Sequence, residues 1–135
     1  MSIYIQSNQV VSLPNTNLTI SAVDTGKIMI TPQTVGATNI TFTLPSLAAG
    51  LHYRFINGAP AALSGTVLIL SQTANSIFGS ILTGPTLGVA LKDVNGQTQT
   101  GFLTGISIRG DYIDLTCDGT NWYIDGRSRV ANGVQ

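Results

Sequence analysis

Charged side chains are scarce in this sequence. Asp, Glu, Lys and Arg make up 9% of its 135 residues, against about 25% in an average globular protein. Glutamate is absent, and six Asp balance six Lys and Arg, so the formal net charge is zero. A neutral chain without a basic run lacks the electrostatic footprint of a protein that binds nucleic acid or an anionic membrane surface. We therefore expect neither as a partner.

Cysteine and histidine each occur once, which restricts the available chemistry. Cys117 cannot form an intrachain disulfide, and its place in an alternating segment predicts a small buried side chain. A Ser-His-Asp or Cys-His centre would have to use His52, and the chain has no G-x-S-x-G motif. A zinc site needs about four His, Cys or carboxylate ligands. We expect no enzymatic activity, no metal and no cofactor, with His52 at the surface or in a subunit contact. A small hydrolase is the alternative, and only hydrolytic activity that is lost in His52→Ala would favour it.

A long unbroken apolar run is also missing. Residues 55–91 carry no charge, but Asn, Gln, Gly and Pro interrupt them. Their apolar runs fall short of the about 20 residues that a membrane-spanning helix needs, so we expect no membrane insertion. Residues 1–5 have neither a basic start nor the apolar stretch of a secretion signal. The 43% of hydrophobic residues is nevertheless enough for a folded core.

The densest acidic set consists of Asp111, Asp114, Asp118 and Asp125. Calcium binds such oxygen ligands, and paired carboxylates hydrolyse glycosides. The spacing differs from that of an EF-hand loop, and Asp118 and Asp125 each precede a glycine, as turn residues do. We interpret these residues as turn and surface groups, with calcium binding and glycosidase chemistry as the alternatives.

Alternation of apolar and polar residues is the main structural signal. Within residues 110–126, Ile113, Leu115 and Cys117 alternate with polar residues, and Asp118-Gly119 supplies a turn, so the segment predicts a β-hairpin. A second turn of the Asn-Gly type is predicted at Asp93–Gly96. Further strands are predicted at residues 10–13, 18–23, 27–31, 39–44, 51–56, 67–70, 76–82 and 87–91.

The spacing of these strands predicts the fold class. Strands recur about every 8–12 residues with turn signals between them, and no long segment has a helical period with caps at both ends. We predict one all-β domain over residues 1–135, an antiparallel β-sandwich of jelly-roll-like layout. Residues 1–17 are expected to form an N-terminal strand or arm, and residues 127–135 a short C-terminal tail that begins as a strand and ends frayed.

The continuous apolar run at residues 67–70 predicts a strand that is buried on both faces. Such a strand fits either the interior of a sandwich or a subunit interface. A surface with so few charges is poorly protected against association, which favours an oligomer. The residues predicted at the subunit interface are Val67, Leu68, Ile69, Leu70, His52 and Arg54.

Trp122 and Tyr123 are neighbours on one predicted strand, so they should point to opposite faces. One is expected to enter the core and the other to face outward. An exposed aromatic ring beside Asn121 and Asp125 could stack on a sugar, as in many lectins. We favour the alternative, in which Trp122 is part of the core and Tyr123 lies at a rim or interface.

Five segments, taken in order, resemble a module of bacteriophage and large DNA virus structural proteins. They are residues 24–27 (DTGK), 40–45 (ITFTLP), 49–55 (AGLHYRF), 110–113 (GDYI) and 118–123 (DGTNWY). The resemblance covers roughly residues 20–126, which is almost the whole of the sequence, so we expect neither a long fibre shaft nor an enzymatic domain within it. It implies a small β-sandwich or jelly-roll-type unit of tail fibres, spikes or capsid-associated proteins, which are often trimeric.

The expected function is therefore that of a non-enzymatic viral structural protein located in the virion and made without a signal peptide. Its expected partners are further copies of itself, as a homotrimer, and other virion proteins. The alternative is a carbohydrate-binding or host-attachment module, in which aromatic side chains and neutral amides recognise host glycans.

Overall fold

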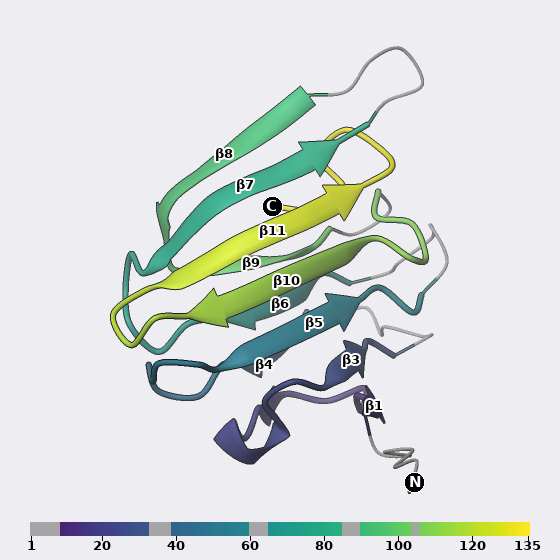
Figure 1. Cartoon of the computed structure of the whole chain (residues 1–135). Coiled ribbons are helices and arrows are strands. Elements are labelled where there is room, and N and C mark those ends of the chain that lie inside the picture. Colours follow the sequence, from purple (N-terminus) through teal and green to yellow (C-terminus); the bar gives the residue numbers. More distant parts are fainter. Residues whose placement is uncertain (1–8, 33–38, 60–64, 85–89, 104–105) are drawn as a thin grey trace, which may run out of the picture.

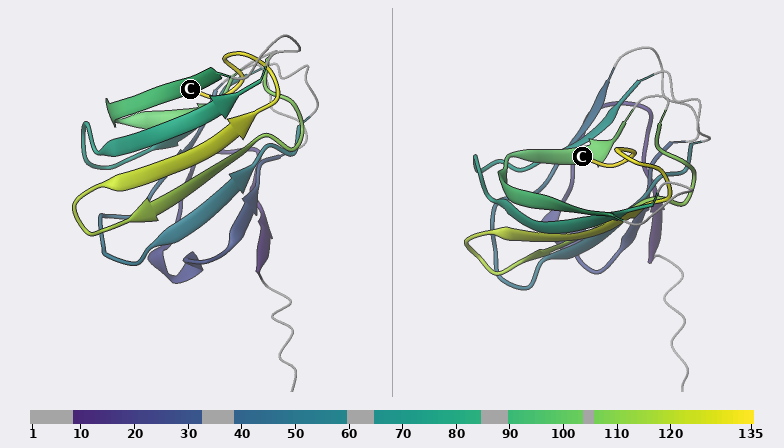
Figure 2. Two further views of the ribbon diagram at one scale, coloured as in Figure 1. Left: turned by 45° about the horizontal axis from the view of Figure 1, so that its top comes forward. Right: turned by 90° about the horizontal axis from the view of Figure 1, so that it is seen from above.

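Two β-sheets packed face to face form the described part of the chain, as Figures 1 and 2 show. The computed structural model describes residues 9–32, 39–59, 65–84, 90–103 and 106–135. A single turn of 3-10 helix, η1, spans Ala22–Asp24. The strands are β1 (Val10–Ser12), β2 (Leu18–Thr19), β3 (Ile28–Ile30), β4 (Ile40–Thr43), β5 (His52–Ile56), β6 (Val67–Leu70), β7 (Ile77–Thr83), β8 (Ala90–Gln97), β9 (Gln99–Phe102), β10 (Tyr112–Cys117) and β11 (Trp122–Ser128).

The larger sheet has seven strands in the order β1-β3-β5-β10-β11-β7-β8, and the smaller sheet has four in the order β2-β4-β6-β9. The predicted all-β class, with two packed sheets, is confirmed. Of the predicted N-terminal arm, residues 1–8 lie outside the described residues, and β1 pairs with β3 at the edge of the larger sheet.

The prediction of an antiparallel sandwich is wrong in part, because both sheets are mixed. Strand β10 runs antiparallel to β5 and β11, whereas β3 runs parallel to β5 and β7 runs parallel to β11. From β3 to β7 the chain passes alternately between the two sheets. Consecutive strands of the same sheet, such as β3 and β5 or β4 and β6, therefore run in the same direction. Alternation of side chains indicates the buried face of a strand and carries no information about the direction of its neighbours.

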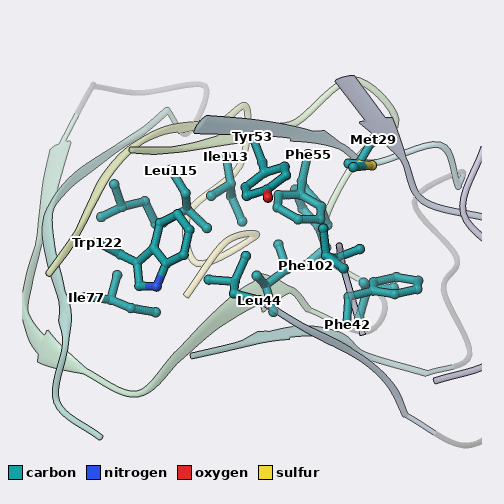
Figure 3. Close-up of a cluster of buried hydrophobic side chains, with 14 of the residues drawn as sticks. Met29, Phe42, Leu44, Tyr53, Phe55, Ile77, Phe102, Ile113, Leu115 and Trp122 are labelled. Atoms are coloured by element: carbon teal, nitrogen blue, oxygen red, sulfur yellow. The ribbon is translucent and has the colours of Figure 1, made fainter. Parts of the chain in front are cut away.

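Aromatic side chains dominate the core between the sheets. Trp122 and Tyr53 come from the larger sheet, Phe42 and Phe102 from the smaller one, and all four are fully buried (Figure 3). The ring centroids of Tyr53 and Trp122 are 6.1 Å apart with a tilt of 46°. The Tyr53 hydroxyl donates a 3.0 Å hydrogen bond to the carbonyl of Ser21, and burial is the main reason that its pKa rises to about 12.

The predicted hairpin at residues 110–126 is confirmed. Strands β10 and β11 pair from Tyr112 opposite Arg127 to Cys117 opposite Trp122. Ile113 and Leu115 have no exposed surface and Cys117 is 2% exposed, so the inward face is the predicted one.

One local prediction is wrong and another is right in part. Asp93–Gly96 lies inside β8 instead of forming a turn, and the chain crosses to the other sheet only after Gln97. The C-terminal segment begins in a strand as predicted, because Arg127 and Ser128 belong to β11, but its end is not frayed, because Val134 is fully buried where it pairs with Phe102. This pairing covers the outer edge of β9, whose backbone groups would otherwise be open to association.

A buried carboxylate organises one end of the sandwich. Asp111, directly before β10, is 1% exposed. Its Oδ2 accepts hydrogen bonds from the Ser107 hydroxyl at 3.0 Å and the Ile108 N–H at 2.9 Å. Its Oδ1 accepts one from the Arg129 N–H at 3.1 Å, and the Ser128 hydroxyl lies 3.1 Å from Oδ2. Asp111 therefore joins the segment before β10 to the end of β11.

We expect Asp111→Ala to lower the free energy of unfolding by at least about 3 kcal/mol, because several buried donors lose their acceptor together. Urea denaturation of the purified protein measures this loss. The matched control is Asp125→Ala, which removes an exposed carboxylate of β11 and should change stability by less than about 0.5 kcal/mol. A loss of under about 1 kcal/mol for Asp111→Ala would contradict the role assigned to this carboxylate.

Candidate functional site

None of the twelve charged residues, all of which the structure describes, lies on the four-stranded sheet. Its strands contain only Leu, Ile, Val, Phe, Thr, Gln and Gly. Pairing places Thr41 beside Leu68 and Thr43 beside Leu70, and these half-buried side chains alternate with core residues. We call the outward side chains of Thr41, Thr43, Leu68, Leu70 and Gln99 the neutral face.

The predicted subunit interface is only partly available at the surface. Val67 and Ile69 are 0% exposed and belong to the core, so their assignment to an interface is wrong. The prediction assumed burial on both faces of β6. In the described part of the chain, one face of β6 packs against the larger sheet and the other carries half-buried Leu68 and Leu70. These two leucines are the members of the run that a second subunit could contact.

Arg54 anchors a polar cluster on the outer face of the larger sheet. Its Nε donates to Asp114 Oδ1 at 2.7 Å and its Nη2 donates to Asp114 Oδ2 at 2.6 Å. The guanidinium carbon also lies 4.7 Å from the centroid of the Tyr112 ring. The hydrogen bond to Asp114 is the main reason that the pKa of Arg54 is raised. Arg54 is thus paired within its own protomer, whereas the predicted contact residue His52 is exposed at the start of β5.

The turn between β10 and β11 is organised by Asp118, as the sequence predicted. Asp118 Oδ1 accepts hydrogen bonds from the N–H groups of Thr120 and Asn121, both at 2.8 Å. Its Oδ2 accepts a 3.0 Å hydrogen bond from the Tyr123 hydroxyl. The backbone donors of Asn121 and Thr120, followed by the Tyr123 hydroxyl, hold the pKa of Asp118 below its ordinary value.

Trp122 and Tyr123 point to opposite faces, as predicted. Trp122 is 0% exposed, so the hypothesis that it contacts a glycan is wrong, because its ring fills the core between the sheets. Tyr123 is 46% exposed and stays the candidate for such a contact. On the outer face of the larger sheet, Tyr123 lies between Thr116 of β10 and Phe78 of β7. These three residues form a row across the strands, which places the aromatic residues Tyr123 and Phe78 next to each other and the hydroxyl group of Thr116 beside them.

Sequence reasoning missed a cluster of arginines at the end of the sandwich where β10 begins and β11 ends. The cluster surrounds an open hollow of about 320 Å³, lined by Arg109, Gly110, Asp111, Tyr112, Arg127 and Arg129. Arg109 precedes β10, whereas Arg127 and Arg129 lie at and just after the end of β11. The pairing of Tyr112 with Arg127 places these two ends of the hairpin side by side, so only strand pairing brings the three arginines together. The available signal was the alternation Arg127-Ser128-Arg129, which directs both arginines to the same side of the chain.

Among the residues that the structure describes, no three His, Cys, Asp or Glu side chains are grouped so that they could hold a metal ion. The described residues also include no helix that is long and apolar enough to cross a membrane. Comparison with known proteins gives no assignment, because the sequence matches no protein-family model, no curated protein and no solved structure.

We expect the Asp118 carboxyl to titrate below its ordinary value of 3.8 in the folded protein. The stabilisation from its hydrogen bonds is present above the pKa of the unfolded chain and is lost as the pH falls through the lower folded pKa. Carboxyl-resolved NMR titration measures this midpoint. Tyr123→Phe removes one of the donors and should raise the midpoint part of the way towards 3.8.

The control for this titration is Tyr112→Phe, which makes the same chemical change at the opposite end of the hairpin. It should leave the Asp118 midpoint where it was. An unchanged midpoint in Tyr123→Phe would contradict the tether between the Tyr123 ring and the turn.

Proposed function

We propose that this chain is a non-enzymatic structural component of a virus particle, which assembles as a homotrimer through its neutral face. The proposal includes a jelly-roll-like layout and contacts with other virion proteins. The observation that carries it is the absence of all twelve charges from the four-stranded sheet, combined with the outward Leu68 and Leu70. The resemblance of five segments to phage and large DNA virus structural proteins supports the same role.

Desolvation favours the neutral face over the other large surface. Burying an ionised group is costly unless it is paired, and the cores of protein interfaces are depleted of charged residues. The outer face of the larger sheet carries Arg54, Asp114, Asp125 and Arg127. The neutral face exposes only leucine, threonine and glutamine side chains, so its burial removes apolar surface from water at little electrostatic cost.

A closed ring of three requires a second surface for the neutral face to meet, because a cyclic trimer repeats one heterologous contact. The edge strand β8 offers such a surface. It carries Lys92 and Asp93, so only the side of the contact formed by the neutral face is free of charge. Leu91 on this strand is 72% exposed, and the burial pattern of the strand is open along most of its length. An exposed edge of this kind is a natural place for a neighbouring subunit to pack.

Light scattering coupled to size exclusion tests the assembly. The wild-type protein should have a mass near three times 14.1 kDa that persists on dilution. A variant with Leu68→Asp and Leu70→Asp should elute as a folded monomer, because two carboxylates would have to be desolvated in each contact. Circular dichroism checks that this variant keeps its fold.

The matched control carries His52→Asp and Thr116→Asp, which places two carboxylates on neighbouring exposed positions of the other sheet. It should keep the wild-type mass. A wild-type monomer at micromolar concentration would refute the trimer. A trimer that survives Leu68→Asp and Leu70→Asp would refute the neutral face as its interface.

A second candidate function is attachment to host glycans, favoured by the exposed ring of Tyr123. The ring lies on an outward row that runs from His52 through Thr116 and Tyr123 to Phe78. An aromatic ring offers a sugar an apolar surface, and neighbouring hydroxyl and imidazole groups can hydrogen-bond to its hydroxyls. The two functions are compatible, because this row and the neutral face lie on different sheets.

For this candidate we expect binding on a glycan array that is lost in Tyr123→Ala and kept in Tyr123→Phe. The phenylalanine variant retains the stacking ring and loses only the hydroxyl that bonds to Asp118. Equal binding by the alanine variant, with an intact fold, would exclude Tyr123 as the contact, and the absence of any bound glycan would exclude the function.

A further inference from the structure

The cluster of three arginines has no task in the assembly or in glycan stacking through Tyr123. We propose that the hollow between Arg109, Arg127 and Arg129 binds a small ligand through an oxyanion group, a carboxylate or a phosphoryl or sulfuryl group. The inference is independent of the proposed function, because the site lies at the end of the sandwich and uses none of the residues of the neutral face.

The charge around the hollow is unbalanced. Half of the six cationic side chains of the chain line it, and the one carboxylate among its lining residues is the buried Asp111. The oxygens of Asp111 already accept hydrogen bonds from its own loop and from the backbone of Arg129, and Arg129 Nε lies 3.8 Å from Oδ1. Three guanidinium groups against one carboxylate leave two net positive charges.

No other carboxylate of the described residues forms an ion pair with these arginines. The ion pairs formed there are Lys27 with Asp24, Arg54 with Asp114 and Arg129 with Asp111, so neither Arg109 nor Arg127 has an acidic partner. Neighbouring like charges repel each other, and the repulsion is removed when an anion enters between them. A chain that has only six cations and places three of them together is therefore arranged to receive a negative group.

Two of the three arginines are held in position by the backbone. Arg109 Nε donates a 2.9 Å hydrogen bond to the carbonyl of Gly58, and the guanidinium of Arg129 donates to the carbonyl of Arg109. Each guanidinium has five N–H donors in a planar fork, so these bonds leave donors that can face a ligand. Such forks match the paired oxygens of carboxylate and phosphate groups.

Gly110 lines the hollow beside Arg129. Its φ of +94° lies in the left-handed region, which other L-residues rarely adopt. A Cβ at this position would lie 3.8 Å from Nη2 of Arg129, which is an ordinary van der Waals distance. The backbone conformation therefore favours glycine at this edge of the hollow.

The size of the hollow limits the ligand. Its volume of about 320 Å³ is at the lower end of the about 300–1,000 Å³ of typical ligand pockets. Tyr112 lines the same hollow, and the centroid of its ring lies 4.7 Å from the guanidinium carbon of Arg54. A long polyanion is a poor fit, because the adjoining cation, Arg54 over the Tyr112 ring, is already paired with Asp114 and the net charge is zero. A single phosphate or sulfate group, or an acidic monosaccharide, fits the volume and the charge.

Isothermal titration calorimetry at low ionic strength tests the site with four probes: inorganic phosphate, sulfate, glucuronate and, as the uncharged control, glucose. The wild-type protein should bind at least one anion with a dissociation constant near or below about 1 mM, and glucose should not compete. Arg127→Gln should weaken this binding at least about tenfold, because it removes a fork without a protein partner. Lys27→Gln removes one positive charge directly before β3, where Lys27 pairs with Asp24 outside the cluster, and should change binding less than about twofold.

The probes distinguish the source of the oxyanion. Preference for phosphate or sulfate assigns the site to a tetrahedral group, and preference for glucuronate assigns it to the carboxylate of an acidic sugar. Both results support the proposal. The absence of saturation by all three anions at about 10 mM would overturn it. Equal binding by wild type and Arg127→Gln, with circular dichroism showing both folded, would overturn it as well.

Discussion

The buried carboxylate of Asp111 sets the geometry of one end of this sandwich. A charge without contact with water has to be met by donors, and two segments of the chain supply them to Asp111. Ser107 and Ile108 come from the segment before β10, and Ser128 and Arg129 come from the end of β11. The same hydrogen bonds hold the segments that carry Arg109 and Arg129, so the carboxylate that we expect to stabilise the fold also shapes the hollow beside it.

The few charged residues are unevenly distributed between the two sheets. The four-stranded sheet carries none of them, and the seven-stranded sheet and the turns carry all twelve. One outer face of the sandwich can therefore be covered by another protein at little electrostatic cost, while the opposite face and one end keep polar chemistry. The proposed assembly and the proposed ligand binding therefore use separate surfaces of one small domain.

Sequence patterns predicted what depends on neighbours along the chain. The β10–β11 hairpin follows from alternation and from Asp118-Gly119, because both act within a few residues. The inward Trp122 and outward Tyr123 follow from the same period. The wrong predictions concern partners that are distant in sequence. Val67 and Ile69 were misassigned because an apolar run does not show which of its faces a second layer will cover. The pairing of Val134 with β9 was not predicted, because it joins residues that are distant in sequence.

The sequence by itself determined the all-β class, the buried face of the hairpin and the turn at Asp118, since these depend on side-chain period and on local backbone preferences. Only the tertiary structure decided which strands run parallel, where the charge-free sheet lies and that Arg109 meets Arg127 and Arg129. The physical reason is that strands pair through hydrogen bonds between backbone segments that are distant in sequence. The alternation of residues along a strand indicates which of its faces is buried, but it does not identify the neighbouring strands.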